Sequence, residues 1–84
     1  MRLEILKDIG LTDGEIKVYM ALLGLGGSTS GPIVEQSGVS VSKVYNILNR
    51  LAQKGLVSHI MKGKVKYFRT ADPQRILDYF EEKE

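Results

Sequence analysis

The chain has 84 residues, 43% of them hydrophobic, which is enough for one small domain with its own core and too little for two. It contains no cysteine and a single histidine, His59, so disulfides and an ordinary zinc site are excluded, and we expect neither a metal nor a cofactor. No apolar run approaches the roughly 18 residues that a membrane helix requires, so we expect a soluble, cytoplasmic protein without membrane association.

The net charge is only +2, but the charges are unevenly distributed along the chain. Residues 36–71 carry seven cationic side chains and no acidic one, whereas the remaining residues carry five cationic and ten acidic side chains. A surface that only needs to be soluble normally mixes both signs, so the acid-free segment indicates binding to a polyanion. Its cations are Lys43, Arg50, Lys54, Lys62, Lys64, Lys66 and Arg69.

The first expected helix covers residues 1–10, where Leu3, Leu6 and Ile9 recur at intervals of three and Gly10 follows. The second covers residues 12–25, because Thr12 and Glu15 have the spacing of a capping box and glycines follow Leu25. Its expected core face has Ile16, Tyr19, Met20 and Leu23 at its centre and is widened by Val18, Leu22 and Leu25.

Residues 31–54 have the pattern of a helix-turn-helix motif. Residues 28–30, before the motif, are expected to form a loop or a minimal strand. Ser30 is the expected N-cap of a short helix, and Gly38 is expected to end that helix. Ser40 is the expected N-cap of a longer helix that Gly55 ends. The apolar stripe of the longer helix is Val44, Ile47, Leu48 and Leu51, and its opposite face has amide, hydroxyl and cationic side chains without an acid.

Residues 56–70 predict a β-hairpin with strands at 56–61 and 65–70 and a turn at Lys62, Gly63 and Lys64. Both alternating faces of the second strand contain apolar residues, so the face that packs on the helices stays open. Asp72 and Pro73 then begin a last expected helix over residues 72–83. Its apolar face is Ile76, Leu77 and Phe80.

The predicted fold is mainly α with a small β-hairpin, in the order of a winged helix-turn-helix. An α-helix fits the major groove of double-stranded DNA, and a basic hairpin beside it can reach phosphates or the minor groove. Asn46 and Asn49 are candidates for adenine edges and Arg50 for guanine, while Ser42, Lys43 and Tyr45 suit backbone contacts. The full candidate DNA surface is Ser40, Ser42, Lys43, Tyr45, Asn46, Asn49 and Arg50 on the helix, and Lys62, Lys64 and Lys66 on the wing.

Residues 10–57 resemble the N-terminal DNA-binding domain of the TrmB family, archaeal regulators of sugar metabolism. The resemblance rests on the pieces GLT with Glu15, VY at 18–19, KVY at 43–45 and KGLV at 54–57, and it extends to about residue 76. It implies that residues 43–50 lie in the helix that reads DNA. The sugar-binding C-terminal domain of full-length members has no counterpart here, so we expect a stand-alone DNA-binding domain without a sugar response.

Two other classes of function compete with transcriptional regulation. A winged helix can instead make protein contacts within a transcription or replication assembly, although the acid-free segment argues against this, and RNA binding has weak support from Tyr67 and Phe68. An enzyme is not expected, because no nucleophile–base set or phosphate-binding glycine loop is recognisable. We also expect a homodimer, formed through Leu3, Leu6, Ile9, Ile76, Leu77 and Phe80 at the two ends of the chain.

Overall fold

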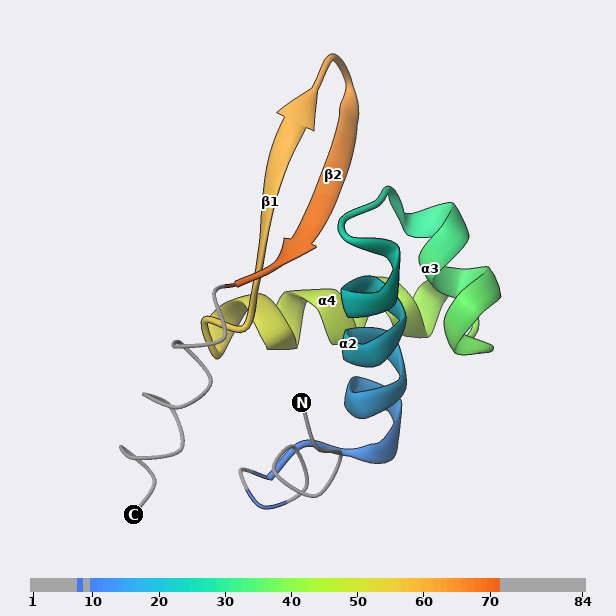
Figure 1. Ribbon diagram of the computed structural model, residues 1–84, viewed down its shortest axis with the longest axis vertical. Coiled ribbons are helices and arrows are strands. Elements are labelled where there is room, and N and C mark those ends of the chain that lie inside the picture. The colour runs from blue at the N-terminus through green and yellow to red at the C-terminus, as the bar shows by residue number, and fades with distance from the viewer. Residues whose placement is uncertain (1–7, 9, 72–84) are drawn as a thin grey trace.

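The computed structural model describes residue 8 and residues 10–71. Within them, three helices are followed by an antiparallel hairpin: α2 (Asp13–Leu25), α3 (Ser30–Ser37), α4 (Val41–Gln53), β1 (Val57–Lys62) and β2 (Val65–Thr70). The helices pack into one body from which the hairpin projects (Figure 1). This is the winged helix-turn-helix architecture that the sequence predicts. The helices expected over residues 1–10 and 72–83 lie outside the described residues.

The start of α2 confirms the predicted capping box. The Glu15 amide donates to Oγ1 of Thr12 at 3.2 Å, and the Thr12 amide donates to Oε1 of Glu15 at 2.9 Å. At the other end Gly26 adopts a left-handed conformation, with φ of 71°, and its amide donates to the carbonyls of Leu22 and Leu23. The sequence therefore sets both ends of α2 by local chemistry.

The buried face of α2 is rotated from the expected one. Val18, Tyr19 and Leu22 are completely buried, whereas Met20 and Leu23 are only partly buried at its edge. The reason is that α2 is central: α3, α4 and β2 all pack against it. Apolar residues cover most of its circumference, so periodicity alone did not identify the centre of the buried arc.

The helix α3 begins one residue earlier than expected. Its N-cap is Thr29, in an extended conformation, and Ser30, the expected cap, is already the first helical residue. Gly38 ends the helix as predicted, with φ of 72° and its amide donating to the Val34 carbonyl. Ser40 is the N-cap of α4 as expected, but its hydroxyl makes no capping hydrogen bond.

The last turn of α4 leads directly into the hairpin. Gly55, with φ of 78°, follows the C-cap Lys54. The Gly55 amide donates to the Ala52 carbonyl and the Leu56 amide to the Leu51 carbonyl, which together form a Schellman motif. Leu51 and Leu56 are both fully buried, so the motif also fixes where the hairpin leaves the core.

The hairpin pairs Val57 with Thr70 at its base and Lys62 with Val65 at its tip. The strand β1 starts and ends one residue later than predicted, which leaves a two-residue turn at Gly63 and Lys64. Gly63 has φ of 65° and Lys64 has no positive φ, the pattern of a type II′ turn. On the other side of β2, Ser28 forms a single antiparallel bridge with Phe68, which confirms a minimal strand before α3.

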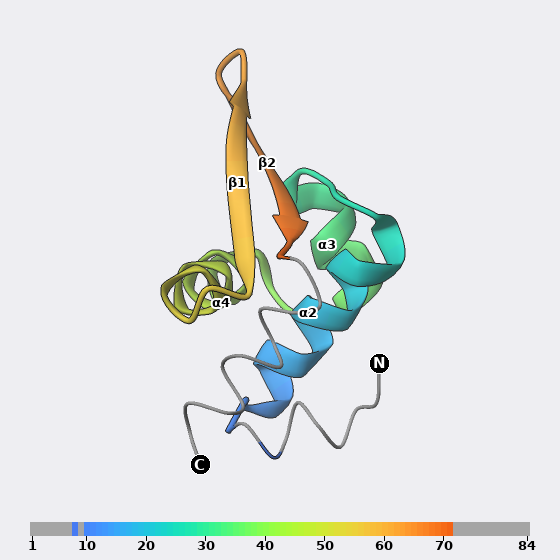
Figure 2. The ribbon, with the colours of Figure 1, turned by 60° about the vertical axis from the view of Figure 1, so that its left-hand side comes forward.

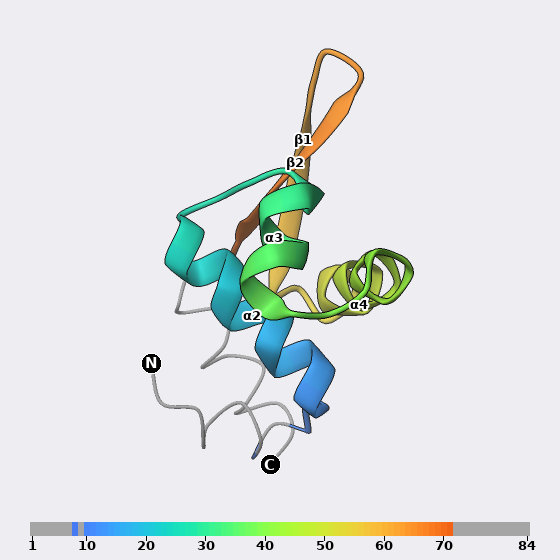
Figure 3. The ribbon, with the colours of Figure 1, turned by 90° about the vertical axis from the view of Figure 1, so that its right-hand side faces the viewer.

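The register also settles which face of the hairpin packs on the helices. Phe68 and Val57 are both buried, whereas Val65 and Arg69 on the opposite face of β2 are exposed. Figures 2 and 3 view α4 nearly along its axis from its two ends and show the hairpin rising beyond the helices. Only the base of the hairpin therefore contributes to the core. The core residues are Leu11, Ile16, Val18, Tyr19, Leu22, Ile33, Val44, Ile47, Leu48, Leu51, Leu56, Val57 and Phe68.

Candidate nucleic-acid interface

The helix α4 separates a buried face from a polar face as its sequence predicts. Val44, Ile47, Leu48 and Leu51 are buried between α4 and the rest of the core. Every candidate side chain of the opposite face is exposed, and these residues are Ser40, Ser42, Lys43, Tyr45, Asn46, Asn49 and Arg50. The polar side chains of this face are therefore accessible to a partner, and no acidic side chain lies among them.

The start of α4 lies beside a small hollow of about 310 Å³. It is lined by the turn before α4 together with Lys43 and, from the first turns of α2, Lys17. The first amides of a helix carry partial positive charge, so two ammonium groups here add to a field that attracts anions. Sequence reasoning missed Lys17, because it lies on α2 and outside the acid-free segment.

The hairpin presents its lysines to solvent. Lys62, Lys64 and Lys66 are all exposed, as expected for a wing. The Lys62 ammonium lies 4.0 Å from the centre of the Tyr67 ring, a cation–π contact that orients it on one face of the hairpin. Tyr67 in turn packs against the backbone at Gly27, next to the Ser28 bridge. The loop before α3 thus supports the hairpin on that face.

A second hollow, of about 420 Å³, separates α4 from the wing. In it the Ser30 hydroxyl lies 3.0 Å from the Tyr45 hydroxyl, so the first residue of α3 is bonded to the exposed face of α4. No local sequence pattern predicts this contact, since the two residues are 15 positions apart. The remaining lining residues come from the hairpin and are Met61, Lys64, Val65 and Lys66.

One cation of the acid-free segment does not belong to this surface. Lys54 donates from Nζ to Oε2 of Glu15 at 2.9 Å, and the Glu15 side chain is only 2% exposed. Burial raises the pKa of the Glu15 carboxyl, but the Thr12 amide and the Lys54 ammonium together outweigh it and lower the pKa below its ordinary value. The expectation of seven uncompensated cations is therefore wrong for Lys54.

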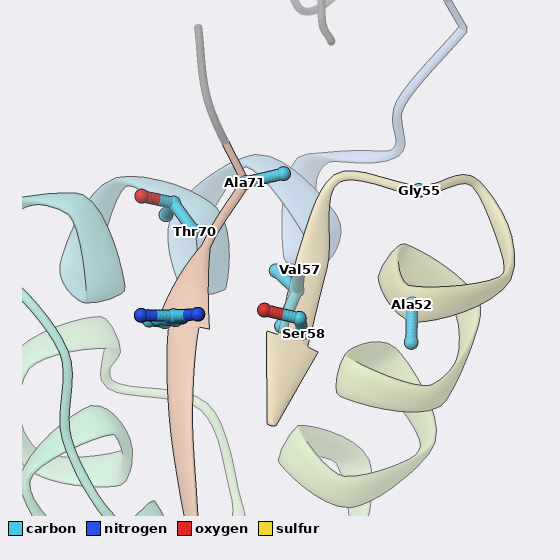
Figure 4. Close-up of a pocket in the computed structure, with 7 residues that line it drawn as sticks. Ala52, Gly55, Val57, Ser58, Thr70 and Ala71 are labelled. Carbon is cyan, nitrogen blue, oxygen red and sulfur yellow. The ribbon is translucent and has the colours of Figure 1, made fainter. Parts of the chain in front are cut away.

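A third hollow, of about 660 Å³, lies at the base of the hairpin (Figure 4). It is bordered by the end of α4 and by both strands, with Ser58, Arg69 and Thr70 as its polar side chains. Among the described residues of the lining, Arg69 is the charged group that accompanies the two hydroxyls.

The expected dimer residues Leu3, Leu6, Ile9, Ile76, Leu77 and Phe80 lie outside the described residues. Within the described ones, no three His, Asp or Glu side chains gather as a metal site would require. None of the helices described here is both long and apolar enough to cross a membrane.

Burial raises the pKa of the Tyr19 hydroxyl, which lies deep in the core.

Comparison with protein families gives a match over most of the chain. Residues 6–74 match the family model described as the sugar-specific transcriptional regulator TrmB. The sugar-sensing transcriptional regulator TrmBL1 of Pyrococcus furiosus is 32% identical over 80 residues, which are 95% of this chain and 23% of that protein. The transcriptional repressor TrmBL2 of Thermococcus kodakarensis is 33% identical over 79% of this chain and 25% of its own length. The chain thus spans about a quarter of the length of these curated relatives.

Solved structures give the same fold. A structure of TrmBL2, described as an archaeal chromatin protein with a novel mode of DNA binding, superposes with a TM-score of 0.80. It is 27% identical and is matched over 96% of this chain and 32% of that one. A possible transcriptional regulator from Methanosarcina mazei has a TM-score of 0.78 at 14% identity, covering 93% of this chain and 71% of its own.

Proposed function

The chain belongs to the TrmB family of transcriptional regulators, and from this premise we propose that it binds double-stranded DNA sequence-specifically to regulate transcription. The observation that carries the proposal is that the exposed face of α4 and the projecting hairpin carry exposed polar and cationic side chains and no acidic one. Such a surface attracts a polyanion without local repulsion, and it combines a helix with a basic ribbon. We propose no catalytic activity and no cofactor.

In this proposal α4 enters the major groove. A helix is about 10–12 Å across and the groove is about 12 Å wide, so the exposed face of α4 meets the base edges. Asn46 and Asn49 have amides that match the donor and acceptor pair of adenine, and Arg50 matches the two acceptors of guanine. Ser40, Ser42 and Lys43 lie at the start of α4, where the helix N-terminus favours phosphate.

The hairpin has the second role. Its lysines project beyond the helices, so they reach the phosphates or the minor groove beside the segment that α4 occupies (Figure 1). Contacts of this kind position a protein on DNA and raise its affinity for every sequence. The proposal therefore divides the surface into a part that reads bases and a part that holds the backbone.

Selection of bound duplexes from a random DNA pool tests this function. We expect enrichment of a short motif, and binding of the selected duplex that is at least about 10³-fold tighter than binding of unrelated duplex. Enrichment without a motif would reduce the function to general DNA binding. Failure to bind any duplex at low salt would remove it.

The competing function is contact with another protein. The observation that favours it is the exposure of large apolar side chains on the hairpin, where Ile60, Met61 and Val65 are 44%, 55% and 52% exposed. Methionine is enriched in protein interfaces, and contiguous exposed apolar side chains mark sites of protein contact. If the chain fails to bind DNA, this surface is the one to test by substitution to Ser or Gln.

A further inference from the structure

The hollow between α4 and the hairpin combines hydroxyl, cationic and apolar groups in one place. We propose that it seats one phosphodiester of the DNA backbone with its adjoining deoxyribose, and that the bonded hydroxyls of Ser30 and Tyr45 donate to the phosphate. The inference rests on the proposed DNA binding and adds a residue of α3 and the apolar side chains of the hairpin to the contact surface. The lining is Ser30, Tyr45, Met61, Lys64, Val65 and Lys66.

The hydroxyl pair supplies a donor that has no other partner among the residues the structure describes. The Ser30 and Tyr45 oxygens are 3.0 Å apart, and either hydroxyl can donate in the bond between them. Two hydroxyls have two protons and their mutual bond uses one, so one O–H remains to donate outward. Ser30 and Tyr45 both line the hollow and Tyr45 is 45% exposed, so the remaining proton can reach an acceptor placed there. A phosphate oxygen is a strong acceptor for it.

The charge of the hollow selects an anion. Lys64 and Lys66 are both exposed, and no acidic side chain is among the lining residues. Lys66 pairs with Met61 across the hairpin, on the same face as the buried Phe68. The ammonium of Lys66 therefore approaches from the face of the hairpin that is turned toward the helices.

The apolar lining distinguishes the DNA backbone from a free anion. Met61 and Val65 are more than half exposed although they border the lysines. Inorganic phosphate would make no use of them, whereas the C–H groups of deoxyribose present an apolar surface directly beside each phosphate. The mixture of groups thus fits a sugar–phosphate segment better than a small anion.

The test measures binding of the full chain to a fluorescent duplex of mixed sequence at several salt concentrations. Tyr45→Phe and Ser30→Ala each remove one hydroxyl and should weaken binding about 3- to 10-fold. The salt slope should stay unchanged, since a neutral hydroxyl displaces no counterion. The double variant should lose less than the product of the two single losses, because either change already breaks the pair.

Tyr67→Phe is the matched control. Tyr67 is not among the residues that line the hollow, so removal of its hydroxyl should leave binding within about twofold of wild type. Thermal melting of each variant establishes folding. Tyr45 is on the surface, so its variant carries the test even if Ser30→Ala lowers stability.

The outcomes of this experiment distinguish failure of the inference from failure of the proposed function. Wild-type binding with both single variants unaffected overturns the inference and leaves the proposed function intact. Absence of wild-type binding removes the proposed function and the inference with it. Inorganic phosphate, added at constant ionic strength, should not displace the duplex; displacement from wild type but not from Tyr45→Phe would assign the hollow to free phosphate and contradict the backbone contact.

Discussion

Lys54 donates a hydrogen bond to Glu15 at 2.9 Å and so joins the C-cap of α4 to the first turn of α2. The same Glu15 carboxylate accepts from the Thr12 amide through its other oxygen. One carboxylate therefore caps α2 and holds the end of α4 against it. The pair belongs to the structural part of the molecule, in contrast to the other cations of residues 36–71.

Removal of this pair should lower stability in a pH-dependent manner. The variant Lys54→Met leaves a buried carboxylate without its cation and should lower the free energy of unfolding by about 1–3 kcal/mol at pH 7, less than for a fully buried pair because the Lys54 side chain is 26% exposed. Because the folded pKa of Glu15 is lowered, its contribution is complete above the unfolded pKa and is lost as the pH falls through the folded pKa. Urea unfolding between pH 3 and pH 7 measures this change.

Glu15→Gln provides the control for that measurement. It keeps an oxygen that can accept from the Thr12 amide but has no charge to titrate. The stability difference between wild type and Glu15→Gln should shrink from pH 7 to pH 3. A difference that stays constant over this range would contradict a charged, stabilising Glu15.

The hairpin lysines should govern the salt dependence of DNA binding. Replacement of Lys64 and Lys66 by Ala should lower affinity for all duplexes alike, and should reduce the slope of log affinity against log salt by about one for each lost phosphate contact. Lys54→Met should leave the slope unchanged, since its ammonium already has a partner. Equal slopes for wild type and the double hairpin variant would show that these lysines make no contact with DNA phosphates.

The polar face of α4 should govern sequence preference instead. Asn46→Ala or Arg50→Ala should cost about 1–3 kcal/mol on the selected duplex and much less on unrelated DNA. Leu51→Ala is the control from the buried face: it creates a cavity, lowers stability by about 2–5 kcal/mol and affects binding only through unfolding. If folded Asn46 and Arg50 variants retain both affinity and preference, α4 does not read bases.

Gly27 should be intolerant of a side chain. Its φ is 113°, and a Cβ there would lie 3.0 Å from the Tyr67 ring that supports the hairpin. Gly27→Ala should therefore lower the free energy of unfolding by about 1–3 kcal/mol. Gly24→Ala, inside α2 with open space around it, should raise it by about 0.5–1 kcal/mol. Thermal melting compares the two, and a stabilising Gly27→Ala would contradict the contact.

The chain is also predicted to form a homodimer through its terminal apolar residues. One small core is not expected to cover the apolar surface of both ends of the chain. The residues concerned are Leu3, Leu6 and Ile9 at one end and Ile76, Leu77 and Phe80 at the other. A dimer places two α4 helices on half-sites about 34–36 Å apart, one turn of DNA. Sedimentation at micromolar concentration measures the mass, and a monomer throughout would make this prediction wrong.

The parts of the fold that were predictable from sequence depend on local chemistry. Thr12 with Glu15, and the glycines at 38 and 55, determine helix ends through contacts within a few residues. The stripe of α4 was predictable because its other face is uniformly polar. The predicted start of α3 was one residue too late, because Thr and Ser both cap helices and the sequence alone does not distinguish Thr29 from Ser30.

The parts that were not predictable depend on contacts between distant residues. Lys54 and Glu15 are 39 positions apart, so the charge count of residues 36–71 treats Lys54 as unpaired, whereas in the fold Glu15 neutralises it. The alternation in β2 has apolar residues on both faces, and only packing of Phe68 against the helices distinguishes them. The role of Ser30 beside Tyr45 likewise required the packing of α3 against α4.

The projection of the hairpin has a consequence for how such a protein can change over evolutionary time. Its base is anchored by Val57 and Phe68, while every residue of the outer segment 60–66 is exposed. Substitutions in exposed positions usually change stability by less than about 0.5 kcal/mol. In the proposed function, substitutions in this segment can therefore change the affinity for DNA in small steps while the stability of the domain stays nearly constant.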